Sequence, residues 1–113
     1  MSVTIWHNPR CSKSRHTLEL LKANGVDPEI RLYAHDAPSE AEIHEVLGLL
    51  GMMPRELMRV KDALYKGLDL QHEEGEALIK AMAANPMLIE RPIVFANGKA
   101  AIGRPPEAVL AIL

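Results

Sequence analysis

The segment His7 to Arg15, "HNPRCSKSR", contains the only cysteine of this 113-residue chain, Cys11. Its flanks are polar and charged, whereas a structural cysteine is usually surrounded by apolar residues. Arg10, Lys13 and Arg15 lie close to the thiol in sequence. Positive charge favours the thiolate, which is the nucleophilic form of cysteine. We therefore expect Cys11 to be a reactive thiol, with a buried and unreactive cysteine as the alternative.

The spacing around Cys11 argues against two common kinds of thiol site. A tyrosine-phosphatase loop needs an arginine six residues after the cysteine, and Thr17 occupies that position. A dithiol redox motif needs a second cysteine three residues on, and that position is Ser14. Any adduct on Cys11 must then be resolved by an outside thiol. The five histidines are scattered without metal-ligand spacing, so no metal site is expected.

Three arginines decide what the thiol attacks: Arg59 in "PRELMR", Arg91 in "ERPIVFANG" and Arg104 in "GRPPE". Arg91 and Arg104 each precede a proline, and together they bracket a predicted hairpin. Guanidinium groups around a thiolate suit a tetrahedral oxyanion, because their planar fork pairs with two oxygens at once. For each arginine taken singly, a solvated surface charge is the alternative.

The elements that must position these residues begin with a strand over Val3–Trp6. A helical pattern starts at Ser12 and stops at Gly25. Cys11 then lies at the start of this helix, where free N–H groups and the helix dipole favour a thiolate. A second strand is predicted over Glu29–Ala34. Its apolar residues alternate at Ile30, Leu32 and Ala34.

The rest of the chain is predicted to be helical apart from one hairpin. A capping-box pattern at Ser39–Glu42 starts a helix that ends at Gly51, and Pro54 opens a short helix through Arg59. Another helix ends before Pro86. Asn97-Gly98 between two apolar runs predicts a type I′ hairpin turn. A terminal helix starts at Pro105. Leu78, Ile79 and Met82 are expected to face inward on the helix before Pro86, and the terminal helix carries Val109, Leu110 and Leu113.

The element order is β-α-β, a helical block, and then β-hairpin-α. The opening implies a parallel strand pair with a right-handed crossover, and the hairpin adds two antiparallel strands. We therefore predict one α/β domain over residues 1–113, with a thioredoxin-like mixed four-stranded sheet. The core spans about 1–37 and 89–113, and a helical insertion of about 38–88 separates the βαβ and ββα halves.

Composition limits the possible partners. The net charge of −2 gives no attraction to nucleic acid or to an anionic membrane. No stretch approaches the roughly 18 apolar residues of a membrane span, and no signal peptide is visible. A single cysteine fits a reducing compartment. We expect a cytoplasmic protein with no nucleic-acid or membrane partner, and a monomer.

The chain resembles the glutaredoxin-coupled arsenate reductase family, to which Spx-type proteins are related. The matching segments are "IWHNPRCSKSR", "TLELL", "RELMR" and "ERPIVFANGKAAIGRPPEAVLAIL". The resemblance implies a thioredoxin-like fold with a helical insertion and a catalytic nucleophile at Cys11. It implies a cis-proline beside the site at Pro92, and thiolate stabilisation by His7 and Ser14. The oxyanion-binding arginines of the family correspond to Arg59, Arg91 and Arg104.

The mechanism that the resemblance implies is attack of the Cys11 thiolate on arsenate or a similar oxyanion. Glutathione then acts as co-substrate, glutaredoxin is the protein partner, and no bound cofactor is needed. Two alternatives are an Spx-type redox regulator and a glutathione-linked thiol carrier. Ser14 counts against the regulator, because most redox-sensing members carry a cysteine there. In a thiol carrier the three arginines would be replaceable. For His7, the alternative to stabilising the thiolate is a strand-end histidine without a role.

Overall fold

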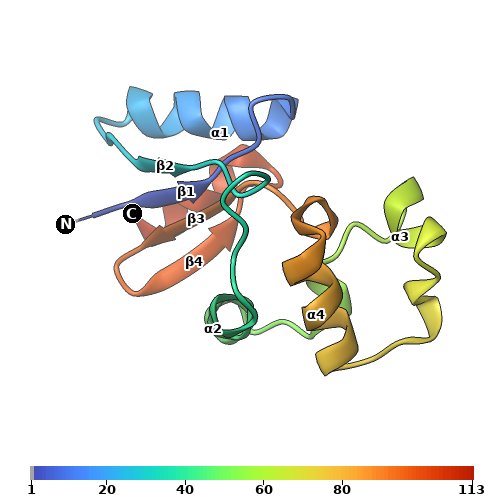
Figure 1. Ribbon diagram of the computed structural model, residues 1–113. Coiled ribbons are helices and arrows are strands. Elements are labelled where there is room, and N and C mark those ends of the chain that lie inside the picture. The colour runs from blue at the N-terminus through green and yellow to red at the C-terminus, as the bar shows by residue number, and fades with distance from the viewer. Residues whose placement is uncertain (1) are drawn as a thin grey trace. The chain divides into compact units, whose positions relative to one another are not determined.

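The computed structural model describes residues 2–113, which form two compact units (Figure 1). The first unit runs up to Asp36 and resumes at Arg91, and the second is Ala37–Glu90. Within residues 2–113, no helix combines the length and the apolar character that crossing a bilayer requires.

The first unit contains the predicted mixed four-stranded sheet, and this prediction is confirmed. Its strands are β1 (Thr4–Trp6), β2 (Glu29–Arg31), β3 (Ile93–Ala96) and β4 (Lys99–Ile102), in the order β2-β1-β3-β4. Strands β1 and β2 are parallel, and α1 (Ser12–Ala23) connects them. The β1–β3 and β3–β4 pairs are antiparallel. The sheet therefore joins two segments of the chain that are far apart in sequence.

The core of this unit lies between the sheet and helix α1, which covers one face (Figure 1). The C-terminal 3₁₀ helix η4 (Pro106–Ile112) packs against both α1 and β4. The buried core residues are Val3, Ile5, Leu21, Val94, Ala96 and Val109. The alternate positions of β1 and β3 face the other way, where the rings of Trp6 and Phe95 lie 5.1 Å apart.

The second strand is shorter than predicted, and two apolar residues of the predicted alternation are exposed. Strand β2 ends at Arg31 because a turn follows, in which two backbone N–H groups donate to the carbonyl of Leu32. The turn interrupts the predicted alternation. Ile30 and Leu32 are 43% and 42% exposed, whereas Tyr33 is fully buried with its ring 6.4 Å from that of Trp6.

The hairpin is confirmed, and the terminal helix needs a correction. Asn97 and Gly98 have φ angles of 54° and 71°, as a type I′ turn requires. The final segment η4 is a 3₁₀ helix rather than an α-helix, and it begins after Pro105. Residues three apart share one side of a 3₁₀ helix. Val109 is therefore buried, while Leu110 and Leu113 of the same segment are 37% and 40% exposed.

The second unit contains two well-defined helices that pack on each other, α2 (Glu40–Leu50) and α4 (Glu76–Ala84). The capping box at the start of α2 is confirmed: Ser39 accepts from the N–H of Glu42, whose carboxylate accepts from the N–H of Ser39. The predicted inward residues of α4 are buried, namely Leu78, Ile79 and Met82.

The short elements of the second unit were mostly not predicted. The segment after Pro54 is a 3₁₀ helix, η1 (Pro54–Leu57), and does not extend to Arg59 as predicted. The backbone becomes extended at Met58, which pairs with Ile89 in an isolated antiparallel bridge. The further short elements are α3 (Ala63–Gly67), η2 (Leu70–His72) and η3 (Pro86–Leu88).

Candidate active site

Cys11 occupies the N-cap position of helix α1, as predicted from the sequence. The loop from β1 reaches it through a turn in which the N–H of Cys11 donates to the carbonyl of Asn8 at 3.0 Å. The carbonyl of Cys11 accepts the first helical hydrogen bond, from the N–H of Arg15 at 3.0 Å. Cys11 is partly exposed. The sulfur is therefore held at the positive end of the helix and is open to solvent.

The surroundings of Cys11 favour its ionised form. Burial raises the pKa of the Cys11 thiol, but the N–H groups of Ser14 and Lys13 and the guanidinium of Arg91 outweigh it. The net result is a pKa below the usual value for a thiol. Two of these groups are backbone donors of the first helical turn, which have no partner inside a helix. Backbone N–H groups next to Cys11 and the side chain of Arg91, which is distant in sequence, thus favour the nucleophilic thiolate form.

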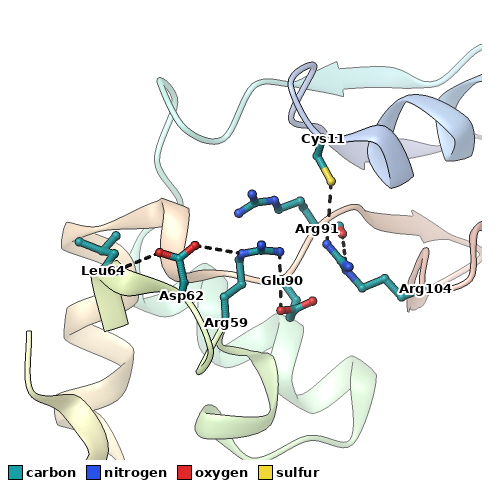
Figure 2. A network of polar contacts seen from close by, with 7 residues as sticks. All are labelled: Cys11, Arg59, Asp62, Leu64, Glu90, Arg91 and Arg104. Carbon is teal, nitrogen blue, oxygen red and sulfur yellow. Dashed lines mark hydrogen bonds and ion pairs between the residues drawn. The ribbon is translucent and has the colours of Figure 1, made fainter. Parts of the chain in front are cut away.

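Arg104 lies beside the sulfur. Its Nη2 is 3.8 Å from Cys11 Sγ, and its Nε donates to the carbonyl of Arg91 at 2.9 Å (Figure 2). Arg91 precedes Pro92, and the peptide bond between them is cis, as is the Arg104–Pro105 bond. The two Arg-Pro steps that bracket the hairpin in sequence therefore meet next to Cys11.

Arg59 belongs to the second unit, where carboxylates surround its guanidinium. Its Nε lies 3.6 Å from Asp62 Oδ2, and its Nη1 lies 3.9 Å from Glu90 Oε1 (Figure 2). Its backbone N–H donates to the carbonyl of Leu88 at 2.8 Å. Arg59 is thus well anchored within its own unit, and its role in oxyanion binding stays a prediction.

His7 and Ser14 contact each other in the buried part of the loop. His7 Nδ1 lies 2.7 Å from Ser14 Oγ, which also accepts from the N–H of Asn8 at 3.0 Å. Burial, and then the charges of Arg15 and Lys22, lower the pKa of His7, so the ring is neutral at pH 7. The Ser14 side chain thus holds the loop together, while its N–H is the group that acts on the Cys11 thiolate.

Arg15 also braces the loop, because its Nη1 donates to the carbonyl of Pro9 at 2.9 Å. Asn8 makes a second local bond, in which its Oδ1 accepts from the N–H of Arg10 at 3.0 Å. This is the geometry of an Asx turn. The sequence analysis missed Asn8, although an Asn-Pro pair is a recognised turn signal.

In the described part of the chain, no group of three His, Cys, Asp or Glu side chains is arranged to hold a metal ion. The groups that the structure places at the site are a thiol with a lowered pKa and the guanidinium and N–H donors beside it. Such donors suit an anion with several oxygens.

A comparison with protein families matches residues 6–112 to the model of the ArsC family. The chain belongs to the ArsC family. This confirms the family indicated by the segment around Cys11 and by the segment from Glu90 to the C-terminus.

Relatives of known sequence and structure support the same assignment. The chain is 59% identical over 114 aligned positions to the uncharacterized protein YfgD of Escherichia coli K12, covering 98% of this chain and 96% of that one. It is 49% identical to an arsenate reductase of Haemophilus influenzae, covering both chains fully. The solved structure of an arsenate reductase from Vibrio cholerae has 50% identity and a TM-score of 0.96, and covers 100% of this chain and 98% of that one. The predicted thioredoxin-like α/β fold is thereby confirmed.

Two residues near the site of this ArsC-family protein were not singled out for the site by sequence reasoning. Thr17 is fully buried in α1, and its hydroxyl donates to the carbonyl of Lys13 at 2.8 Å. Gly103 is buried directly before Arg104, and its N–H donates to the carbonyl of Pro92 at 2.9 Å. Nothing in the local sequence signals that these residues meet.

Proposed function

We propose that this protein reduces arsenate to arsenite, with Cys11 as nucleophile and with glutathione and glutaredoxin as the external reductants. The observation that carries the proposal is the Cys11 thiol, whose pKa is lowered at the start of α1 and whose sulfur lies 3.8 Å from Arg104 Nη2. The names of the relatives from Haemophilus influenzae and Vibrio cholerae also support it.

In the first step, Arg91 and Arg104 bind the oxyanion beside the sulfur. Their charges offset the repulsion between an anionic nucleophile and an anionic substrate. The thiolate attacks arsenic and one arsenate oxygen leaves as water, which gives a Cys11–S–As(V) bond. Holding the oxyanion next to the sulfur makes this attack effectively unimolecular.

In the second step, glutathione displaces another oxygen of the adduct as water and forms a second sulfur–arsenic bond. The thiolate of glutaredoxin then attacks the glutathione sulfur. The electron pair of the broken S–As bond stays on arsenic, which passes from As(V) to As(III), and a glutathione–glutaredoxin disulfide leaves. Hydrolysis of the remaining Cys11–S–As(III) bond releases arsenite and regenerates the thiol. Overall, two thiols are oxidised to one disulfide and one water is formed.

External thiols are required because Cys11 is the only cysteine of the chain. The position where a dithiol motif has its second sulfur is Ser14, and its hydroxyl oxygen is already bonded to the N–H of Asn8 and lies against His7. This arrangement disfavours an Spx-type sensor that forms an internal disulfide. Since the reaction consumes reduced glutathione, we place the protein in the cytoplasm. We assign it as a monomer, because the proposed steps use the residues of one chain.

We assign Arg59 to oxyanion binding as the third arginine, from its match to the family pattern. Its guanidinium is paired with Asp62 and Glu90 at 3.6 and 3.9 Å, distances long enough for a bound oxyanion to compete for the same N–H groups. Pro92 is assigned a supporting role, because its carbonyl accepts from Gly103 and thereby ties the two Arg-Pro segments together.

The test is NADPH oxidation in the presence of glutathione, glutathione reductase, glutaredoxin and arsenate, with Cys11→Ser as the blank. We expect turnover that depends on arsenate and disappears in the variant, which keeps a small polar residue at the N-cap of α1. If the folded protein shows no turnover above the blank, arsenate is not its substrate. NADPH oxidation that does not depend on arsenate, and that survives replacement of Arg91 and Arg104 by glutamine, would point to a glutathione-linked thiol carrier instead.

A further inference from the structure

Gly103 lies where two other segments of the first unit leave no room for a side chain. A Cβ atom at this position would lie 2.5 Å from Thr17 Oγ1 and 2.7 Å from Pro92 Cγ. Favourable contacts between heavy atoms need about 3.5–4.0 Å. All seven glycines of the chain lie among the described residues, and at the other six a Cβ would have no neighbour within 4 Å. Position 103 therefore has no room for the Cβ atom of any other residue.

Neither neighbour is a flexible side-chain end that moves aside easily. The Thr17 hydroxyl is buried and donates to the carbonyl of Lys13 within α1 at 2.8 Å. The ring of Pro92 is buried and rigid, and its carbonyl accepts from the N–H of Gly103 at 2.9 Å. A side chain at position 103 would therefore push the end of β4 away from α1, from Pro92, or from both.

The segments that meet at Gly103 carry the cationic groups of the site. Arg104 follows Gly103 directly, and Arg91 directly precedes Pro92. The Nε of Arg104 donates to the carbonyl of Arg91 at 2.9 Å, while its Nη2 is 3.8 Å from Cys11 Sγ. Cys11 itself caps the helix that contains Thr17. A shift at Gly103 therefore changes the distance between both arginines and the sulfur.

We propose that Gly103 is a positioning residue: its missing side chain lets the end of β4 close onto Pro92 and Thr17, which sets the Arg104 guanidinium beside Cys11. This deepens the proposed function, on which the kinetic part of its test rests. The residue acts through Arg104 and Arg91 and does not itself touch the reacting atoms.

The test compares Gly103→Ala with a matched control, Gly48→Ala. Gly48 is exposed in α2, and a Cβ there meets no atom within 4 Å. For Gly103→Ala we expect kcat/KM for arsenate to fall by about tenfold or more, mainly through KM, since small misplacements of positioned groups have large effects. In Gly103→Ala, the pH midpoint of Cys11 alkylation by iodoacetamide should also lie higher than in the parent protein. Gly48→Ala should change neither quantity by more than about twofold.

A double-mutant cycle with Arg104→Lys separates positioning from general packing. If Gly103 acts by placing Arg104, the lysine substitution should cost much less in the Gly103→Ala background than in the parent protein. If the two losses simply multiply, Gly103 acts elsewhere and the proposal is overturned. The variant Thr17→Ala/Gly103→Ala returns space on the helix side, and we expect it to recover part of the alkylation rate lost in Gly103→Ala.

The alkylation readout needs no arsenate, so the two proposals fail separately. Absence of arsenate turnover in the parent protein refutes the proposed function, and an upward shift of the alkylation midpoint in Gly103→Ala still supports positioning. A folded Gly103→Ala protein with parental alkylation and kinetics overturns the role of Gly103. If neither Gly103→Ala nor the double variant folds, as judged by circular dichroism, the residue serves general packing and the positioning role is refuted.

Discussion

Replacing Arg104 with methionine should make the Cys11 thiol harder to ionise. The substitution keeps much of the length of the side chain but removes the charge whose Nη2 lies 3.8 Å from the sulfur. It also removes the Nε donor to the carbonyl of Arg91. We expect the pH midpoint of Cys11 alkylation by iodoacetamide to move upward, and the alkylation rate below that midpoint to fall.

The size of the effect follows from the distance and from the exposure of the thiol. Two unit charges 3.8 Å apart interact by about 1 kcal/mol in a dielectric like that of water, and by about twice that when the dielectric constant is halved. Because Cys11 is partly exposed, the lower figure applies. It corresponds to roughly a sixfold change in the ratio of thiolate to thiol. Alkylation of Arg104→Met at pH values below the midpoint should therefore be slower by about that factor.

The control is Lys99→Met, which removes a cation from the other end of the same strand. Lys99 is exposed and begins β4, whereas Arg104 follows its end. Five residues of extended chain span about 16 Å, which exceeds the Debye length of about 8–10 Å at ordinary ionic strength. Lys99→Met should match the parent protein. An unchanged midpoint in folded Arg104→Met, or equal shifts in both variants, would refute the reasoning.

Three further predictions concern stability. Ser14→Ala leaves the N–H of Asn8 without its buried acceptor and should lower the free energy of unfolding by about 1–3 kcal/mol in urea titrations; an unchanged value would show that water replaces the hydroxyl. Because burial and nearby positive charges lower the pKa of His7, its unfolded form binds a proton more readily. Stability should therefore fall as the pH drops below about 6.5, and a His7→Gln variant with the same pH dependence would contradict this. Ser39→Ala removes the hydroxyl that accepts from the N–H of Glu42 in the capping box and should cost about 1 kcal/mol, measured by thermal unfolding against Ser2→Ala.

Local sequence chemistry was enough to predict several elements. Asn97-Gly98 specifies its turn because both residues tolerate positive φ angles, and the Ser39–Glu42 pattern specifies a helix start through two reciprocal hydrogen bonds. The end of β2 was not predictable in the same way. Alternation favoured burial of Ile30 and Leu32, but the packing of Tyr33 on Trp6 is a tertiary contact with no local signal.

The site shows the same division between local and distant information. The position of Cys11 at a helix start could be derived from the local pattern. The packing of Gly103 against Thr17 and Pro92 brings the two ends of the β3–β4 hairpin against helix α1, which is more than 70 residues away along the chain, so no local pattern predicts it. When a glycine has neither a positive φ angle nor a turn signal, a single sequence does not reveal that glycine is required there. At Gly103 that requirement comes from neighbours in the fold that leave no room for a side chain.

Nearness in sequence is not what brings the guanidinium groups of Arg91 and Arg104 to the thiol. Arg15 is four residues from Cys11, yet its Nη1 donates to the carbonyl of Pro9 and braces the loop. The N–H groups of the first helical turn all point along the axis toward the N-cap, whatever side chains they carry. The cationic groups that act on Cys11 come instead from Arg91 and Arg104, about 80–90 residues away along the chain, because the β3–β4 hairpin ends beside the start of α1. The thiolate is therefore stabilised both by backbone N–H groups close to Cys11 in sequence and by guanidinium groups far from Cys11 in sequence. The tight packing at the end of β4 holds these guanidinium groups in place.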